Sequence, residues 1–166
     1  MCHLKGEKMK KVVLACESSS VDLKEAIKQR LIDAGYEVKD VGQQPGGETV
    51  LYYEAAENLA KEIQSGKYER GIAICGTGAG VSLVLNKYRN VYAVACESVF
   101  TAEKILHINN ANVLCMGSRV VSHDMGGEMA LKYLEGRWCE GFTPERRKNN
   151  ENGYAKLKSL EEEFYR

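Results

Sequence analysis

The sequence predicts an α/β fold, a three-layer αβα sandwich in which helices cover both faces of a five-stranded parallel sheet. Three observations predict it: short apolar runs alternate with longer amphipathic runs, the apolar runs are rich in β-branched residues, and no repeat or linker divides the chain. Strands that are apolar along their whole length are typical of parallel sheets buried on both faces. One domain is therefore expected over residues 10–166, after a poorly ordered leader over residues 1–9.

Five segments are expected to be strands. Most are short apolar runs such as Lys-Val-Val-Leu-Ala-Cys at residues 11–16, whereas residues 36–42 alternate between apolar and polar positions. The expected strands span residues 11–16, 36–42, 70–75, 91–96 and 112–116.

Helices are expected between the strands and after the last of them. In the first, Leu23, Ile27 and Leu31 recur every four residues and so share one face; Ser18–Ser20 are expected to cap its start, and Gly35 to end it. The last helix is polar with a periodic apolar stripe, and it is expected to extend to a partner subunit. The expected helices span residues 21–34, 52–64, 81–88, 101–108, 126–134 and 146–165.

Composition narrows the function classes. The chain has 166 residues, and its 23 Lys and Arg balance its 23 Asp and Glu, which argues against nucleic acid or an anionic membrane as a partner. No apolar run reaches the ~18 residues of a membrane span, and the first residues show no apolar secretory core, so a cytoplasmic location is expected. The six cysteines show no CxxC spacing, which favours free thiols over zinc or disulfides.

Candidate chemistry gathers where the predicted strands end. Cys16, Cys75, Cys96 and Cys115 each stand at or next to the carboxyl end of a strand. Open parallel sheets bind their ligands at this edge. We therefore expect the functional site among the segments that follow these cysteines.

The run Gly76-Thr-Gly-Ala-Gly80 is the sharpest local feature. Three glycines between a strand and a helix let backbone N–H groups converge on an anion. The run lacks the Gly-Lys-Ser/Thr of a P-loop and the last glycine of a dinucleotide fingerprint. Cys75 directly precedes it, and a thiolate beside an N–H cradle suits proton abstraction next to a carbonyl, with the cradle holding the enediolate. A tight turn without a ligand is the alternative.

Two longer motifs resemble the ribose-5-phosphate isomerase B family, which also contains the galactose-6-phosphate isomerase subunits. They are Arg70–Ser82, followed by Asn86-Lys87, and the run Asn109–Val120; the resemblance covers roughly residues 10–147. It implies a Rossmann-like fold, a homodimer or dimer of dimers with active sites shared between subunits, and no metal or cofactor. The implied reaction is aldose–ketose isomerisation of a sugar phosphate through a cis-enediolate.

The resemblance also implies roles for individual residues. Cys75 is the base that moves a proton between C1 and C2, and Thr77 assists the cradle in holding the enediolate oxygens. The residues it places around the sugar are Glu17, Ser18, Tyr52, Gly76, Gly78, Ala79, Gly80, Ser82 and Asn109, and those it places at the phosphate are Arg119, Arg146 and Arg147.

The sequence departs from the family pattern around the substrate. Glu17 and Ser18 replace an aspartate and a histidine, Thr143 replaces an arginine, and Ile108 replaces the histidine that opens the sugar ring. These changes leave the isomerisation groups in place, so we expect a substrate that stays open-chain, such as a tetrose phosphate. The alternative is a catalytically impaired or partner-dependent subunit of a hetero-oligomeric, galactose-6-phosphate-type isomerase.

Overall fold

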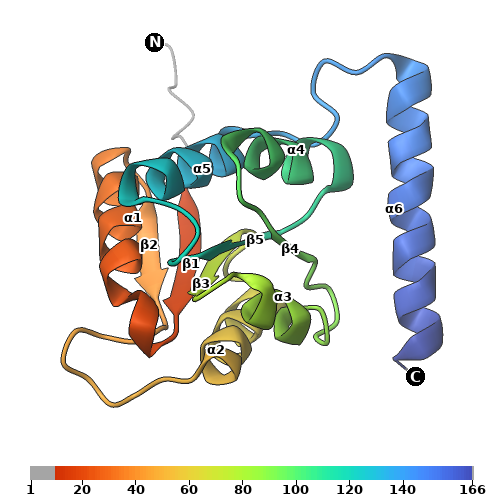
Figure 1. Cartoon of the computed structure of the whole chain (residues 1–166). Coiled ribbons are helices and arrows are strands. Elements are labelled where there is room, and N and C mark those ends of the chain that lie inside the picture. The colour runs from red at the N-terminus through yellow and green to blue at the C-terminus, as the bar shows by residue number, and fades with distance from the viewer. Residues whose placement is uncertain (1–9, 166) are drawn as a thin grey trace, which may run out of the picture.

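The computed structural model of the chain describes residues 10–165, so the expected leader over residues 1–9 lies outside the described residues. Five parallel strands form one sheet in the order β2-β1-β3-β5-β4. The predicted parallel α/β sandwich is confirmed (Figure 1). The strands are β1 (Lys11–Cys16), β2 (Glu37–Asp40), β3 (Gly71–Cys75), β4 (Ala93–Ala95) and β5 (Val113–Gly117).

Helices cover both faces of the sheet. Helices α1, α4 and α5 lie on one face and α2 and α3 on the other, while α6 stands apart from both layers (Figure 1). The helices are α1 (Val21–Asp33), α2 (Tyr52–Gln64), α3 (Ala79–Leu85), α4 (Val99–Asn109), α5 (His123–Glu135) and α6 (Pro144–Phe164), with a 3-10 turn η1 (Ser18–Ser20) before α1.

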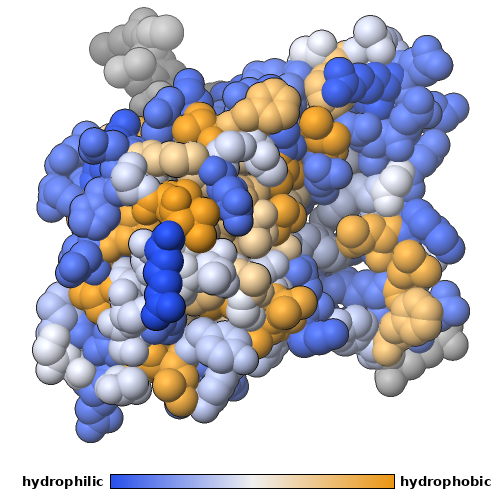
Figure 2. Space-filling model, viewed as in Figure 1, coloured by the Kyte–Doolittle hydropathy of each residue, from blue (hydrophilic) through white to orange (hydrophobic). Residues whose placement is uncertain are grey.

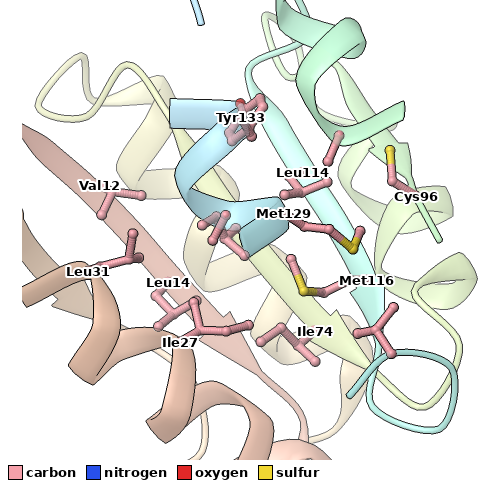
Figure 3. Packing of buried hydrophobic residues seen from close by; sticks show 14 of the residues in the cluster. Val12, Leu14, Ile27, Leu31, Ile74, Cys96, Leu114, Met116, Met129 and Tyr133 are labelled. Carbon is pink, nitrogen blue, oxygen red and sulfur yellow. The ribbon is translucent and has the colours of Figure 1, made fainter. Parts of the chain in front are cut away.

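Each face of the sheet has its own apolar core. Figure 3 shows the larger core, in which side chains of β1, β3 and β5 meet α1 and α5. Leu23, Ile27 and Leu31 are all buried there, which confirms the helix face predicted from their spacing. Gly126 and Gly127 let α5 approach α1 closely, because a Cβ at Gly127 would lie 2.5 Å from Arg30 Cδ.

Several predicted boundaries were wrong, for local reasons. The third helix begins at Ala79 instead of residue 81, because Gly78 takes a left-handed conformation and starts the helix directly after it. Helix α5 begins at His123 instead of residue 126, since Ser122 caps it by accepting a bond from the Met125 N–H. Helix α4 likewise begins at Val99, after a Ser98 cap.

Ser20 takes the predicted N-cap position of α1, but its side chain makes no capping bond there. Glu17 caps the preceding 3-10 turn, its carboxylate accepting a bond from the Ser19 N–H. The reason is length: the glutamate side chain folds back over the three serines that follow it.

Helix α6 lies against the chain through polar and aromatic contacts. Glu161 accepts bonds from the Asn90 N–H and the Tyr92 hydroxyl, and Tyr154 contacts the rings of Tyr92 and Trp138. No residue of α6 is buried. Among the helices of residues 10–165, none combines the length and the apolar character needed to cross a membrane.

Candidate active site

The order of the strands places a topological switch point between β1 and β3, and the carboxyl edge of the sheet at this point is called the crevice here. Strand β1 lies between β2 and β3, so the chain leaves β1 toward one side of the sheet and later returns to the other. The segments after β1 and β3 therefore diverge, and such a switch point is where open α/β sheets bind ligands. Glu17 and Ser18 follow β1 at this crevice, and Cys75 ends β3 beside them, as the sequence predicted.

The glycine run forms a tight turn that packs directly on the end of β5. Gly78 has φ +81°, and a Cβ there would lie 2.9 Å from the backbone of Met116. Gly117 faces the turn from the other side, where a Cβ would lie 2.7 Å from the backbone of Thr77. Main chain thus meets main chain at this point, and a side chain has no room between them.

Cys75 stands at the base of this turn. Its side chain is buried, and its sulfur accepts a hydrogen bond from the Gly78 N–H at 3.2 Å. Thr77 is exposed, and its hydroxyl oxygen accepts a bond from the Ala79 N–H at 3.3 Å. The turn therefore brings a thiol, a hydroxyl and several backbone N–H groups together, which is the equipment for stabilising a developing oxyanion.

Other cysteines near this edge are held in the protonated form. Burial is the main cause that raises the pKa of Cys16 to about 12 and the pKa of Cys96 to about 11. Cys115 lies fully inside the sheet, and burial raises its pKa well above the ordinary value. These three thiols are therefore core residues rather than alternative bases.

Glu17 is committed to its own turn. Its carboxylate accepts bonds from the Ser19 hydroxyl at 2.6 Å and the Ser20 hydroxyl at 2.8 Å, and the Ser20 hydroxyl also pairs with that of Ser118 at 2.9 Å. Burial works to raise the pKa of Glu17, but hydrogen bonds from the serines outweigh it and lower that pKa below its usual range. Glu17 is thus a fixed negative charge at the crevice.

Two side chains flank the glycine turn. The Tyr52 ring, from the start of α2, lies on Gly80, where a Cβ would be 3.0 Å from the ring. On the other side, Arg119 Nε would be 3.5 Å from a Cβ at Gly76. The Arg119 N–H donates to the Gly76 carbonyl at 3.1 Å, so the main chain fixes this cation beside the turn.

A second group of predicted residues lies elsewhere. Asn109 ends α4, just before the amino end of β5, whereas Cys75 pairs with Gly117 at the carboxyl end of that strand. A five-residue strand is roughly 13 Å long, so the two groups are separated by about the depth of the sheet. Ser82 has a structural contact of its own, because its hydroxyl donates to the Ala93 carbonyl of β4.

The two arginines at the start of α6 lie in the same region of the chain's surface as the end of α4, where Asn109 stands. Arg147 donates to the Cys139 carbonyl at 3.2 Å, and the Arg146 guanidinium lies 3.9 Å from the centre of the Phe142 ring. Asn150 of α6 donates to the Ile108 carbonyl, which ties this region to the end of α4. One chain therefore holds its candidate residues as two separate half-sites.

The position next to Asn109 carries no acid or base directed at the crevice. Ile108 is apolar, and its carbonyl accepts bonds from Trp138 and Asn150. The preceding residue, His107, contacts the Glu140 carbonyl through Nε2 at 2.7 Å and packs on the Phe142 ring. His107 is thus occupied within its own half-site.

Two buried polar residues that support the crevice were not predicted from the sequence. Lys24 has no exposed surface, and Gln43 is 95 % buried in a loop that was expected only to connect two elements. Spacing could have revealed Lys24, because it precedes Ile27 by three residues and Leu31 by seven and so shares their inner face. Nothing in the sequence distinguishes Gln43 from the exposed Gln44.

The sequence of the chain is similar to those of known sugar isomerases. Residues 12–150 match the family model described as Ribose/Galactose Isomerase. The chain is 39 % identical over 156 residues to the 4-deoxy-4-sulfo-D-erythrose isomerase of Clostridium sp. (strain MSTE9), covering 94 % of this chain and 98 % of that protein. It is 33 % identical over 133 residues to the D-erythrulose-4-phosphate isomerase of Pectobacterium atrosepticum, covering 80 % of this chain and 88 % of that protein.

The fold has a close match among solved structures. Ribose-5-phosphate isomerase B of Clostridium thermocellum superimposes with a TM-score of 0.83 at 29 % identity, covering 93 % of this chain and 99 % of that chain. The similarity therefore extends over nearly all of that structure.

Gly78 provides a direct test of the cradle's geometry. Gly78→Ala should lower the free energy of unfolding by at least about 2 kcal/mol, because it adds a left-handed alanine and a contact with the Met116 backbone. Chemical denaturation measures the change. Gly76→Ala is the matched control, since the atoms nearest to its Cβ belong to the Arg119 side chain and lie at ordinary contact distance. Equal stability of the two variants would contradict the close packing described above.

Proposed function

The chain belongs to the ribose/galactose isomerase family, and from this premise we propose which sugar it isomerises and how. Its reaction is the aldose–ketose isomerisation of a phosphorylated sugar. The substrate we propose is an open-chain, four-carbon sugar with an anionic group on C4. The buried free thiols of residues 10–165 favour a reducing compartment, the cytoplasm.

The glycine turn after β3 carries this proposal. The Cys75 thiolate takes the proton from the carbon next to the carbonyl, and the electrons of that C–H bond form a carbon–carbon double bond as the carbonyl electrons move to oxygen. Backbone N–H groups of the first turn of α3 and the Thr77 hydroxyl hold the resulting enediolate. The hydroxyl proton then moves from one enediolate oxygen to the other. Cys75 returns its proton to the neighbouring carbon as the deprotonated oxygen becomes the new carbonyl, which completes the interconversion.

Two observations support a four-carbon skeleton. The isomerases of Clostridium sp. and Pectobacterium atrosepticum described above are named for sugars of the erythrose and erythrulose type, with sulfonate or phosphate at position 4. Such a sugar lacks the free 4-hydroxyl needed to close a furanose ring. In agreement with this, an apolar residue, Ile108, occupies the position that would serve ring opening, and His107 is bound to Glu140.

The two half-sites support a shared active site. We propose that Asn109, Arg146 and Arg147 of one chain complete the crevice of a second copy, supplying the cations for the substrate's anionic end. One chain keeps these residues about a sheet's depth from Cys75. Figure 2 also shows an apolar strip over the C-terminal half of α6, where Leu157, Leu160 and Phe164 are exposed. A second copy would cover such a strip.

Replacing the base should stop proton transfer at carbon. We expect Cys75→Ala to lower isomerisation by about 10²–10⁴-fold, the range of general acid–base catalysis. Proton NMR of substrate in deuterated water measures C1/C2 exchange independently of turnover. Cys96→Ala is the control, because this buried thiol is held protonated and should leave exchange intact. Exchange at the wild-type rate in Cys75→Ala would refute the role of Cys75.

The enzyme should prefer four-carbon substrates over five-carbon ones. We expect kcat/KM for D-erythrulose 4-phosphate or 4-deoxy-4-sulfo-D-erythrulose to exceed that for D-ribulose 5-phosphate by about tenfold or more, since each tenfold corresponds to about 1.4 kcal/mol of transition-state binding. Steady-state assays of the three substrates on one preparation decide this. The two four-carbon substrates also separate phosphate from sulfonate recognition. Equal or better turnover of the pentose would overturn the proposal.

Mixed oligomers test the shared site. Cys75→Ala and Arg147→Ala chains should each be impaired alone, yet recover about a quarter of wild-type activity after unfolding and refolding together, because half the dimers are mixed and one of their two sites is intact. No recovery would mean that both residues serve the same chain's site. An obligate partnership with an unlike subunit predicts instead that the purified wild-type chain is inactive.

A further inference from the structure

Lys24 is a buried cation behind the crevice. Its Nζ lies 2.6 Å from Asp40 Oδ2 and 2.9 Å from Glu25 Oε1, and it donates to the Gln43 carbonyl at 2.5 Å. Burying a charge costs free energy unless the charge is paired and hydrogen-bonded. Here two carboxylate oxygens and one carbonyl oxygen surround the ammonium group and offset that cost. The lysine thus joins α1 to the end of β2 and to the loop that follows.

Gln43 connects Lys24 to the loop over residues 43–51, because its backbone carbonyl binds Lys24 and its side chain binds the loop. Its side-chain Nε2 donates to the carbonyls of Gln44 at 2.9 Å and Gly47 at 3.1 Å, and its Oε1 accepts from the Val50 N–H at 2.7 Å. A single buried amide therefore closes the loop on itself. Other residues of the loop from 44 to 49 are exposed, so their side chains contribute little packing of their own.

The far end of the loop reaches the crevice at two points. The Val50 carbonyl accepts a bond from the Ser18 N–H at 3.0 Å, which couples the loop to the turn after β1. Two residues later α2 begins, and the Tyr52 ring lies on Gly80 of the glycine turn. The position of Val50 thus sets both Ser18 and Tyr52.

We infer that Gln43, held by Lys24, is a positioning residue that sets Tyr52 and Ser18 against the glycine turn for substrate binding. This inference rests on the proposed isomerase function of the same crevice. Gln43 touches no reacting atom, because its side chain is spent on the loop. Its loss should therefore weaken binding of the sugar while leaving the proton transfer by Cys75 in place.

The test compares two neighbouring glutamines. Gln43→Met removes the three side-chain bonds at similar volume and should raise the substrate KM by about tenfold, with kcat within about twofold. Gln44→Met is the matched control, since this side chain is exposed and donates to the Gly42 carbonyl at the start of the loop. Equal KM values for the two variants, or a loss confined to kcat, would overturn the inference.

A double-mutant cycle separates positioning from a general loss of stability. If Gln43 acts through Tyr52, the KM effects of Gln43→Met and Tyr52→Ala should not add, because the second change removes what the first one positions. Additive effects would show that Gln43 acts independently of the ring and would overturn this route.

Amide hydrogen exchange tests the hydrogen bond from the Val50 N–H to Gln43 Oε1 without any substrate; this bond is called the clamp below. The Val50 N–H should be protected in the wild type and in Gln43→Glu, which keeps an acceptor oxygen, and should exchange rapidly in Gln43→Met. Unchanged Val50 protection in Gln43→Met would refute the clamp. If the wild type binds no sugar, the proposed function fails, and Val50 protection still reports separately on the clamp.

Discussion

The site depends on one close approach of main chain to main chain, between the glycine turn after β3 and the end of β5. Glycines on both sides, Gly78 and Gly117, make this approach possible, and the parallel register that pairs Cys75 with Gly117 brings the two segments to the same level. The approach fixes the thiol, the N–H groups of the turn and the neighbouring Arg119 in one arrangement. The Tyr52 ring also lies on this turn, against Gly80.

Local pattern was enough to predict the fold and the position of the glycine turn at the carboxyl edge of the sheet. The four-residue spacing from Leu23 to Leu31 identified the buried face of α1, and the position of Cys75 before three glycines identified the turn. The pattern failed where a polar side chain takes an unexpected partner. Lysine is ordinarily a surface residue, so the burial of Lys24 depends on Asp40, sixteen residues away. The cap formed by Glu17 likewise depends on side-chain geometry that hydropathy does not encode.

The division of the candidate residues between two half-sites could not be predicted from the sequence. The family resemblance implied active sites shared between subunits, but its motifs do not record which residues, Asn109 and Arg147 or Cys75, each chain supplies. The structure separates them through simple topology: a crossover helix that starts at one edge of a parallel sheet ends at the other. The end of α4 lies at this far edge, and Asn150 of α6 donates to the Ile108 carbonyl there, which joins the start of α6 to it.

A reaction centre built mainly from peptide N–H groups also affects how the family can diversify. Substitution at an ordinary position alters a side chain but leaves the peptide groups of the Gly76–Gly80 turn chemically unchanged. The surrounding contacts, such as Ser18 after β1 and the loop before Tyr52, come from separate segments with their own supports. Mutational drift can therefore reshape what the crevice accepts while the bond-making step is conserved, which gives one scaffold access to sugars of different length.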